Sequence, residues 1–287
     1  MTIRNPLEWG LDQFRIAGLA LSSASNAIRG SDEELNAPPL AIRRIGVADL
    51  RDALAKGVDD FLAYRTDVIF LCFIYPVIGL ALGRLAFGYD MLPLLFPLAS
   101  GFALIGPFAA IGLYEMSRRR ELAVSVAWPD AFGVVRSPAF GKIAALGLML
   151  VVLFLLWLAT ADAIYLHTLG PAPPASLEAF LRDVFTTGPG WALIVLGVGI
   201  GFLFAVLALT IGVVSFPLLL DRHVATGTAV WTSARAVAAN PVPMALWGAI
   251  VAGGLVIGSI PALLGLAVVM PVLGHATWHL YRRLVAD

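Results

Sequence analysis

The sequence predicts an all-α, polytopic membrane protein with six transmembrane helices, arranged as three hairpin repeats with amphipathic cytoplasmic helices before them. Three observations lead to this fold class: an apolar composition, long runs without charged side chains, and basic residues gathered on one side of those runs. Hydrophobic residues make up 60% of the 287 residues and charged residues 13%, against roughly 45–50% and 25% in soluble domains. A soluble fold of this length has too little interior to bury that share.

The charge balance limits the classes of partner. The chain has 19 basic and 19 acidic residues, so its formal net charge is zero. This balance argues against nucleic-acid binding through a basic face and predicts no strongly charged partner. The single cysteine excludes an internal disulfide and a cysteine-only metal site. The partner that the composition does predict is the lipid bilayer.

Six segments approach the length of a membrane-spanning helix, which needs about 20 mostly apolar residues. The last run without Asp, Glu, Lys or Arg, 243–281, is about twice that length. It contains the turn-like sequence Gly258-Ser259-Ile260-Pro261, so we expect two helices joined tightly there. The predicted spans are 68–83, 91–114, 143–161, 184–220, 244–259 and 262–282.

Lys and Arg residues predict how these spans are oriented. Eight of them precede the first span and five follow the second, whereas the loops of the other side contain Arg182 alone. Because short cytoplasmic loops are enriched in basic residues, six spans place both termini in the cytoplasm of a bacterial inner membrane. The first 60 residues lack a continuous apolar core, so we expect no signal peptide.

Two kinds of similarity support the hairpin repeat. Trp128 and Trp231 are each followed nine residues later by Ser or Asn and then by Pro. In that pattern a surface helix ends, a capping residue takes the turn, and Pro opens the next helix. The descending helices also share a late proline, at Pro107, Pro217 and Pro271, which bends a span. The alternative is that unrelated apolar helices converge on these patterns.

Residues 1–45 are predicted to be a separate extension and linker before the six-helix domain at 46–287. Asn5-Pro6-Leu7-Glu8 is a typical helix start, and apolar residues recur behind it at a spacing of three or four. We expect an amphipathic helix that lies on the membrane surface or docks on a partner. A second short amphipathic helix is predicted at 176–185, on the outer surface.

Arg84 and Asp162 are candidates for an intramembrane ion pair. Both lie near the outer ends of predicted spans, where a charged residue is costly and marks a functional site. The pair would join the first and third helices. The alternative is that each side chain extends separately to the membrane interface.

Four residues at the cytoplasmic ends of predicted helices form a candidate metal or haem site: Glu115, His223, His275 and His279. His275 and His279 are one helical turn apart and share a face, which suits paired imidazole ligands. The alternative is anchoring at the interface, where such residues are enriched. The His-x-x-x-His spacing here lacks the Glu of a zinc-protease helix.

Motifs of soluble catalysis are missing from the sequence. It contains no Walker loop, no Gly-x-Ser-x-Gly elbow and no Cys-x-x-Cys pair. Gly197-x-Gly199-x-Gly201 lies in an apolar helix, so it predicts a helix-packing face. We therefore expect no enzyme and no resident cofactor, unless the histidines bind haem or a metal.

Two stretches carry a resemblance to a known family. The sequences from Gly106 to Glu121 and from Pro271 to Arg282 resemble a family of predicted bacterial integral membrane proteins of unknown function. The resemblance covers roughly 42–285, and Glu115, His275 and His279 match its distinctive stretches. Some members are encoded near cytochrome c oxidase genes, so the resemblance implies a respiratory context.

Three functions remain open at this stage. We favour a non-enzymatic accessory or assembly protein of the inner membrane, for a membrane complex such as a respiratory oxidase. A small transporter or channel is the second, because proline-bent helices and glycine-rich packing fit that class. The third is a haem or metal handling protein that uses the four candidate ligands.

Overall fold

The computed structural model describes residues 40–72, 92–124, 133–135, 137–261 and 263–286, together with 77, 80 and 84. The predicted amino-terminal helix, most of the first predicted span and Trp128 lie outside these residues. The described residues are helical throughout, apart from turns and one isolated bridge, which confirms the all-α class. The elements are α3 (Val47–Cys72), η1 (Leu92–Leu94), α5 (Leu95–Leu104), α6 (Gly106–Ala109), α7 (Ile111–Glu121), α8 (Phe140–Thr168), α9 (Leu177–Thr186), α10 (Gly188–Gly212), α11 (Ser215–Asp221), α12 (Thr226–Ala239), α13 (Pro241–Ser259) and α14 (Leu266–Leu284).

Three helical segments in the described part of the chain are long and apolar enough to cross a membrane. They are Phe140–Thr168, Gly188–Asp221 and Pro241–Ser259. These segments confirm the predicted spans at 143–161, 184–220 and 244–259. The chain is therefore a multi-pass integral membrane protein.

The predicted span at 91–114 is divided into short helices, which corrects the expectation of one spanning helix there. α5 ends at Leu104, α6 covers four residues, and α7 begins at Ile111. Pro107 stands in the first turn of α6, where its missing N–H and its ring interrupt the preceding helix. The predicted span at 262–282 forms α14, but 13 of its 19 residues are buried and it is not among the candidate spans.

Asn240 and Pro241 separate α12 from α13 as the sequence predicted. α12 ends at Ala239 and Pro241 occupies the first turn of α13. The Asn240 side chain accepts from the backbone N–H of Ile45 at 2.8 Å and donates to the carbonyl of Arg43 at 3.2 Å. Because the first copy of this pattern is only partly described, the hairpin repeat stays a prediction.

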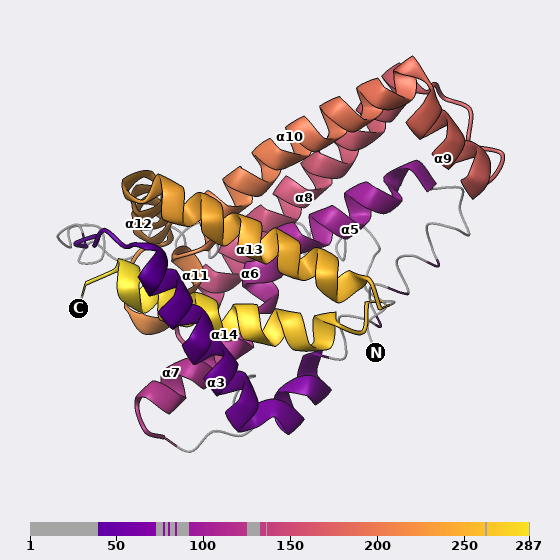
Figure 1. The fold of residues 1–287 in the computed structure, drawn as a ribbon. Coiled ribbons are helices and arrows are strands. Elements are labelled where there is room, and N and C mark those ends of the chain that lie inside the picture. The colour runs from indigo at the N-terminus through magenta and orange to yellow at the C-terminus, as the bar shows by residue number, and fades with distance from the viewer. Residues whose placement is uncertain are drawn as a thin grey trace, which may run out of the picture.

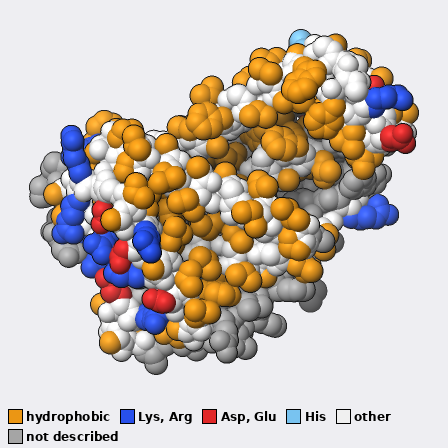
Figure 2. Space-filling view, in the orientation of Figure 1, with side chains coloured by type: hydrophobic (Ala, Val, Ile, Leu, Met, Phe, Trp, Pro, Cys, Tyr) orange, Lys and Arg blue, Asp and Glu red, His pale blue; other side chains and the backbone are white. Residues whose placement is uncertain are grey.

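An arm, which we define as α8, α9 and α10, extends from the rest of the molecule (Figure 1). α8 and α10 lie against each other, and α9 packs on α10 at the far end. Ser176 begins α9 by accepting a hydrogen bond from the N–H of Ala179 at 3.1 Å, so the surface helix predicted at 176–185 is present. Apolar side chains cover much of the arm's outer surface (Figure 2).

A base, which we define as α3, α7, α11 and α14, lies at the other end of the arm (Figure 1). Within it, α3 makes its most extensive contact with α14. Gly57 allows this approach, because a Cβ at that position would lie 2.6 Å from the Cβ of Ala276. The segments flanking the two helices also pair, through an isolated antiparallel bridge between Ile42 and Val285.

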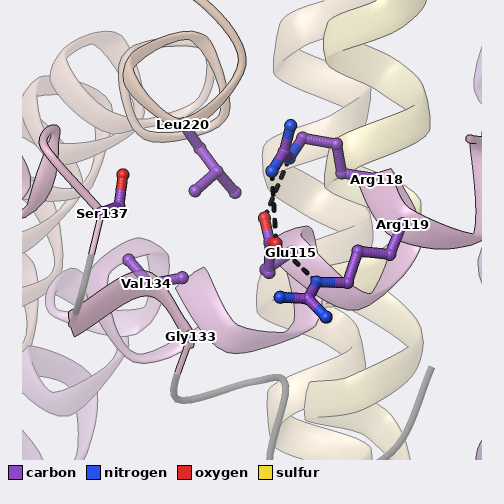
Figure 3. A pocket seen from close by; sticks show the side chains of 7 residues that line it. All are labelled: Glu115, Arg118, Arg119, Gly133, Val134, Ser137 and Leu220. Carbon is purple, nitrogen blue, oxygen red and sulfur yellow. Dashed lines mark hydrogen bonds and ion pairs between the residues drawn. The ribbon is translucent and has the colours of Figure 1, made fainter. Parts of the chain in front are cut away.

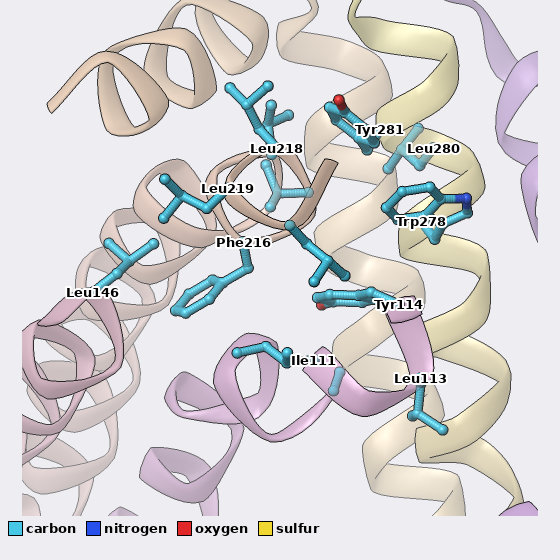
Figure 4. Close-up of a cluster of buried hydrophobic side chains, with 14 of the residues drawn as sticks. Ile111, Leu113, Tyr114, Leu146, Phe216, Leu218, Leu219, Trp278, Leu280 and Tyr281 are labelled. Carbon is cyan, nitrogen blue, oxygen red and sulfur yellow. The ribbon is translucent and has the colours of Figure 1, made fainter. Parts of the chain in front are cut away.

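The core of the base is built from large apolar side chains of α7, α11 and α14 (Figure 4). Tyr114, Phe216 and Trp278 are almost completely buried there. The rings of Trp278 and Tyr281 lie 5.5 Å apart in a tilted arrangement, a geometry that aromatic pairs favour. This packing fixes the helices that present the polar residues described next.

Candidate functional site

A buried polar cluster joins three helices of the base. We call it the Asp60 cluster; its members are Asp60 of α3, Ser117 and Arg120 of α7, and His275 and His279 of α14. Asp60 Oδ2 lies 2.6 Å from Ser117 Oγ and 2.8 Å from His279 Nε2, and Asp60 Oδ1 lies 2.6 Å from Arg120 Nη1. His275 Nδ1 lies 2.8 Å from Ser117 Oγ.

Helical spacing presents these side chains to one another. His275 and His279 are four residues apart and Ser117 and Arg120 three apart, so each pair lies on one face of its helix. The shared face predicted for the two histidines is thus confirmed by their common approach to Asp60. Asp60 and Ser117 were missed in the sequence, because neither belongs to a recognised motif.

The bonding pattern assigns the protons in the cluster. Ser117 Oγ donates to Asp60, so it can only accept from His275, whose Nδ1 therefore carries the hydrogen. His275 Nε2 then carries no hydrogen, and it has no hydrogen-bond partner within the described residues. This order differs from a Ser-His-Asp triad, in which the imidazole lies between the other two groups.

Asp60 is held in its charged form. Burial raises the pKa of its carboxyl, but the hydrogen bonds from His279 and Ser117 and the charge of His279 outweigh burial. The pKa therefore falls below the ordinary value of 3.8. At neutral pH the cluster contains a buried carboxylate with Arg120 as its permanent counter-ion.

The four predicted metal or haem ligands are not brought together. Only His275 and His279 meet, at Asp60. Glu115 instead binds Arg118 and Arg119 on another part of α7, and His223 is exposed. Within the described residues, no group of three or more His, Cys, Asp and Glu side chains is placed to hold a metal ion.

The ion pairs found among the described residues do not include the predicted pair of Arg84 and Asp162. Both side chains are exposed. Most neighbours of Arg84 along the chain lie outside the described residues, so the pair stays a prediction.

Further polar contacts surround the Asp60 cluster at the same end of the molecule. Glu121 accepts from Trp278 Nε1 at 3.0 Å and from Arg282 Nε at 3.1 Å. Tyr281 donates to Asp221 at 2.6 Å. Charged side chains gather over this end in Figure 2. We call the whole set the charged cap; it comprises the Asp60 cluster with Asp52, Glu115, Arg118, Arg119, Glu121, Asp221, Arg222, Tyr281, Arg282 and Arg283.

The fold and its candidate spans define a multi-pass integral membrane protein, and one family comparison agrees. Residues 95–221 match the model of a family described as "Predicted integral membrane protein (DUF2189)", whose function is unknown. The matched region runs from α5 to α11, so it contains Glu115 but not His275 or His279. No curated protein and no solved structure matches the chain.

Proposed function

We propose that the chain is a non-enzymatic accessory or assembly protein of the bacterial inner membrane, with both termini in the cytoplasm. One observation carries the proposal: the polar side chains of the charged cap bind one another across four helices. The Asp60 carboxylate bonds to both α7 and α14, and Tyr281 links α14 to α11. Two of the residues that suggested chemistry in the sequence, His275 and His279, thus connect α14 to α7 and α3.

Buried polar connections of this kind fix geometry more than they add stability. Desolvation of a buried ion pair roughly offsets its attraction, whereas loss of one partner is costly. The charged cap therefore favours one arrangement of the base over others. A fixed platform of this type suits a protein whose role is to hold a partner.

We propose that an exposed tryptophan next to the base, Trp231, contacts the partner protein. Trp231 of α12 is 65% exposed, and α12 is tied to the chain before α3 through Arg235 and the carbonyl of Leu40. Aromatic residues are enriched in the centres of protein interfaces. Following the respiratory context that the resemblance implies, we propose subunits of a respiratory oxidase as the partner.

The experiment is a pull-down of the tagged full-length chain in mild detergent, with mass spectrometry and an absorption spectrum on the same sample. We expect oxidase subunits to copurify with wild type and with Trp191→Ala, and to be lost with Trp231→Ala. Trp191 is the matched control, because it is 55% exposed but lies on the arm. Elution of the wild-type chain alone would overturn the proposal. A haem absorption band lost on His275→Ala would favour haem handling instead.

A transporter or channel is the second candidate, and one observation favours it. The break between α5 and α6 lies next to the break between α10 and α11, since a Cβ on Gly212 would lie 3.1 Å from Pro107 Cγ. Interrupted helices that meet are typical of substrate sites in transporters. In this case Asp162→Ala should abolish proton flux into vesicles containing the purified chain. Unchanged proton flux in Asp162→Ala would contradict a role for Asp162 in transport.

A further inference from the structure

A polar cavity lies between α7, α11 and the chain that leads into α8 (Figure 3). Its volume is about 270 Å³, and a water molecule takes up roughly 30 Å³ in the liquid. The cavity therefore has room for a phosphate group and several waters. The described residues that line it are Glu115, Arg118, Arg119, Gly133, Val134, Ser137 and Leu220.

The described lining carries two positive charges and one negative charge. Glu115, whose side chain is 5% exposed, accepts from Arg118 Nε at 2.9 Å, Arg118 Nη2 at 3.2 Å and Arg119 Nε at 2.8 Å. A guanidinium has five N–H groups, and Glu115 accepts from two of the nitrogens of Arg118. Glu115 thus holds Arg118 in a fixed orientation and leaves other N–H groups of that guanidinium for a second anion.

The cavity lies where two candidate spans reach the same end of the molecule. The span Phe140–Thr168 begins three residues after Ser137, and the span Gly188–Asp221 ends one residue after Leu220. Val135 and Phe140, which flank Ser137 in the chain, are exposed apolar residues. We expect a polar cavity at the end of two candidate spans, beside exposed apolar side chains, to lie near the lipid headgroups.

We propose that this cavity binds a phosphate group, and that the group belongs to the headgroup of an anionic phospholipid. Arginine suits this ligand because its planar fork bonds two phosphate oxygens at once. Arg118 would supply the charge-assisted bonds. Ser137 Oγ, which accepts from the N–H of Ala139 at 3.2 Å, would donate its own hydrogen. The site is independent of the accessory role proposed above.

Glu115 makes the site testable, because it is an internal anion that competes with the ligand for Arg118. Glu115→Gln and Arg118→Gln both remove the same ion pair, so misfolding would change the ligand affinity of the two variants in the same direction. Phosphate binding at Arg118 would change the two affinities in opposite directions. Glu115→Gln should bind the ligand more tightly than wild type, and Arg118→Gln more weakly.

The experiment follows the thermal unfolding of the purified full-length chain in detergent against added dioctanoyl-phosphatidylglycerol or inorganic phosphate. We expect the lipid to raise the unfolding midpoint of wild type. The half-saturating lipid concentration should rise about tenfold in Arg118→Gln, as expected for loss of one charge-assisted bond, and fall in Glu115→Gln. Arg182→Gln is the control for net charge, since Arg182 lies on α9, and it should match wild type.

The two probes distinguish the sources of the phosphate. A response to the lipid alone supports the headgroup, and an equal response to inorganic phosphate supports the same site with free phosphate as its ligand. Equal responses of wild type and Arg118→Gln to both probes would overturn the proposal. So would a weakening of the same size in Glu115→Gln and Arg118→Gln.

Discussion

The arm and the base bury their apolar side chains in opposite ways. Only 6% of the most apolar 18 residues of Gly188–Asp221 are buried within the molecule, whereas 13 of the 19 residues of α14 are buried. The arm relies on lipid to cover its surface, while α14 is covered by α3, α7 and α13. The difference indicates that polar residues determine whether an apolar helix is buried in the protein or faces lipid. α14 carries His275 and His279, whereas α10 carries no charged residue.

The largest expected effect comes from removing the central carboxylate of the base. Asp60→Ala leaves Ser117, Arg120 and His279 without their common acceptor. Loss of one partner from a buried pair costs about 3–5 kcal/mol, and we expect about 3 kcal/mol because Arg120 is 38% exposed and can regain solvent. Thermal unfolding in detergent measures the loss. Asp52→Ala is the control, because Asp52 pairs with Arg283 at the surface, where removal costs less than about 1 kcal/mol. Equal losses in both variants would contradict a distinct buried cluster.

A smaller effect is expected from adding one methyl group to each region. In Gly57→Ala the new Cβ would lie 2.7 Å from the backbone nitrogen of Ala276, so α3 must move away from α14. Overpacking of this kind costs about 2 kcal/mol. Gly199→Ala on the arm meets nothing within 4 Å and should stabilise the helix by about 0.5 kcal/mol. The two unfolding midpoints, measured side by side, should move in opposite directions. A midpoint for Gly57→Ala at or above that of wild type would show that α3 and α14 do not approach so closely.

The smallest effect is the response of the base to acid. The pKa of Asp60 lies below its ordinary value of 3.8, so the folded state binds a proton less readily than the unfolded state. Its contribution to stability is complete above pH 3.8 and is lost as the pH falls through the lower, folded-state pKa. Wild type should therefore exceed Asp60→Asn in stability near neutral pH, and the gap should narrow below about pH 4. Unfolding midpoints of both proteins across that range test this, and a constant gap would contradict it.

The arm was predictable from the sequence and the base was not. Runs without charges place α8 and α10 of the arm, and also α13, because a helix in lipid needs only length and apolar character. The Asp60 cluster depends on partners that lie far apart in the chain: Asp60 and Ser117 are 57 residues apart, and Asp60 and His279 are 219 apart. No local spacing indicates such contacts. The sequence did predict the shared face of His275 and His279, since one helical turn is a local property.

The same long separation determines how late the base can form during synthesis. α3 leaves the ribosome early, and its main partner, α14, follows about two hundred residues later. At roughly 5–20 residues per second this interval lasts roughly 10–45 s. Through that time Leu50 and Ala53, which end almost completely buried, must be covered by lipid or by a chaperone. Until α14 is made and packs on α3, the nascent chain can therefore be bound by other proteins through the apolar face of α3.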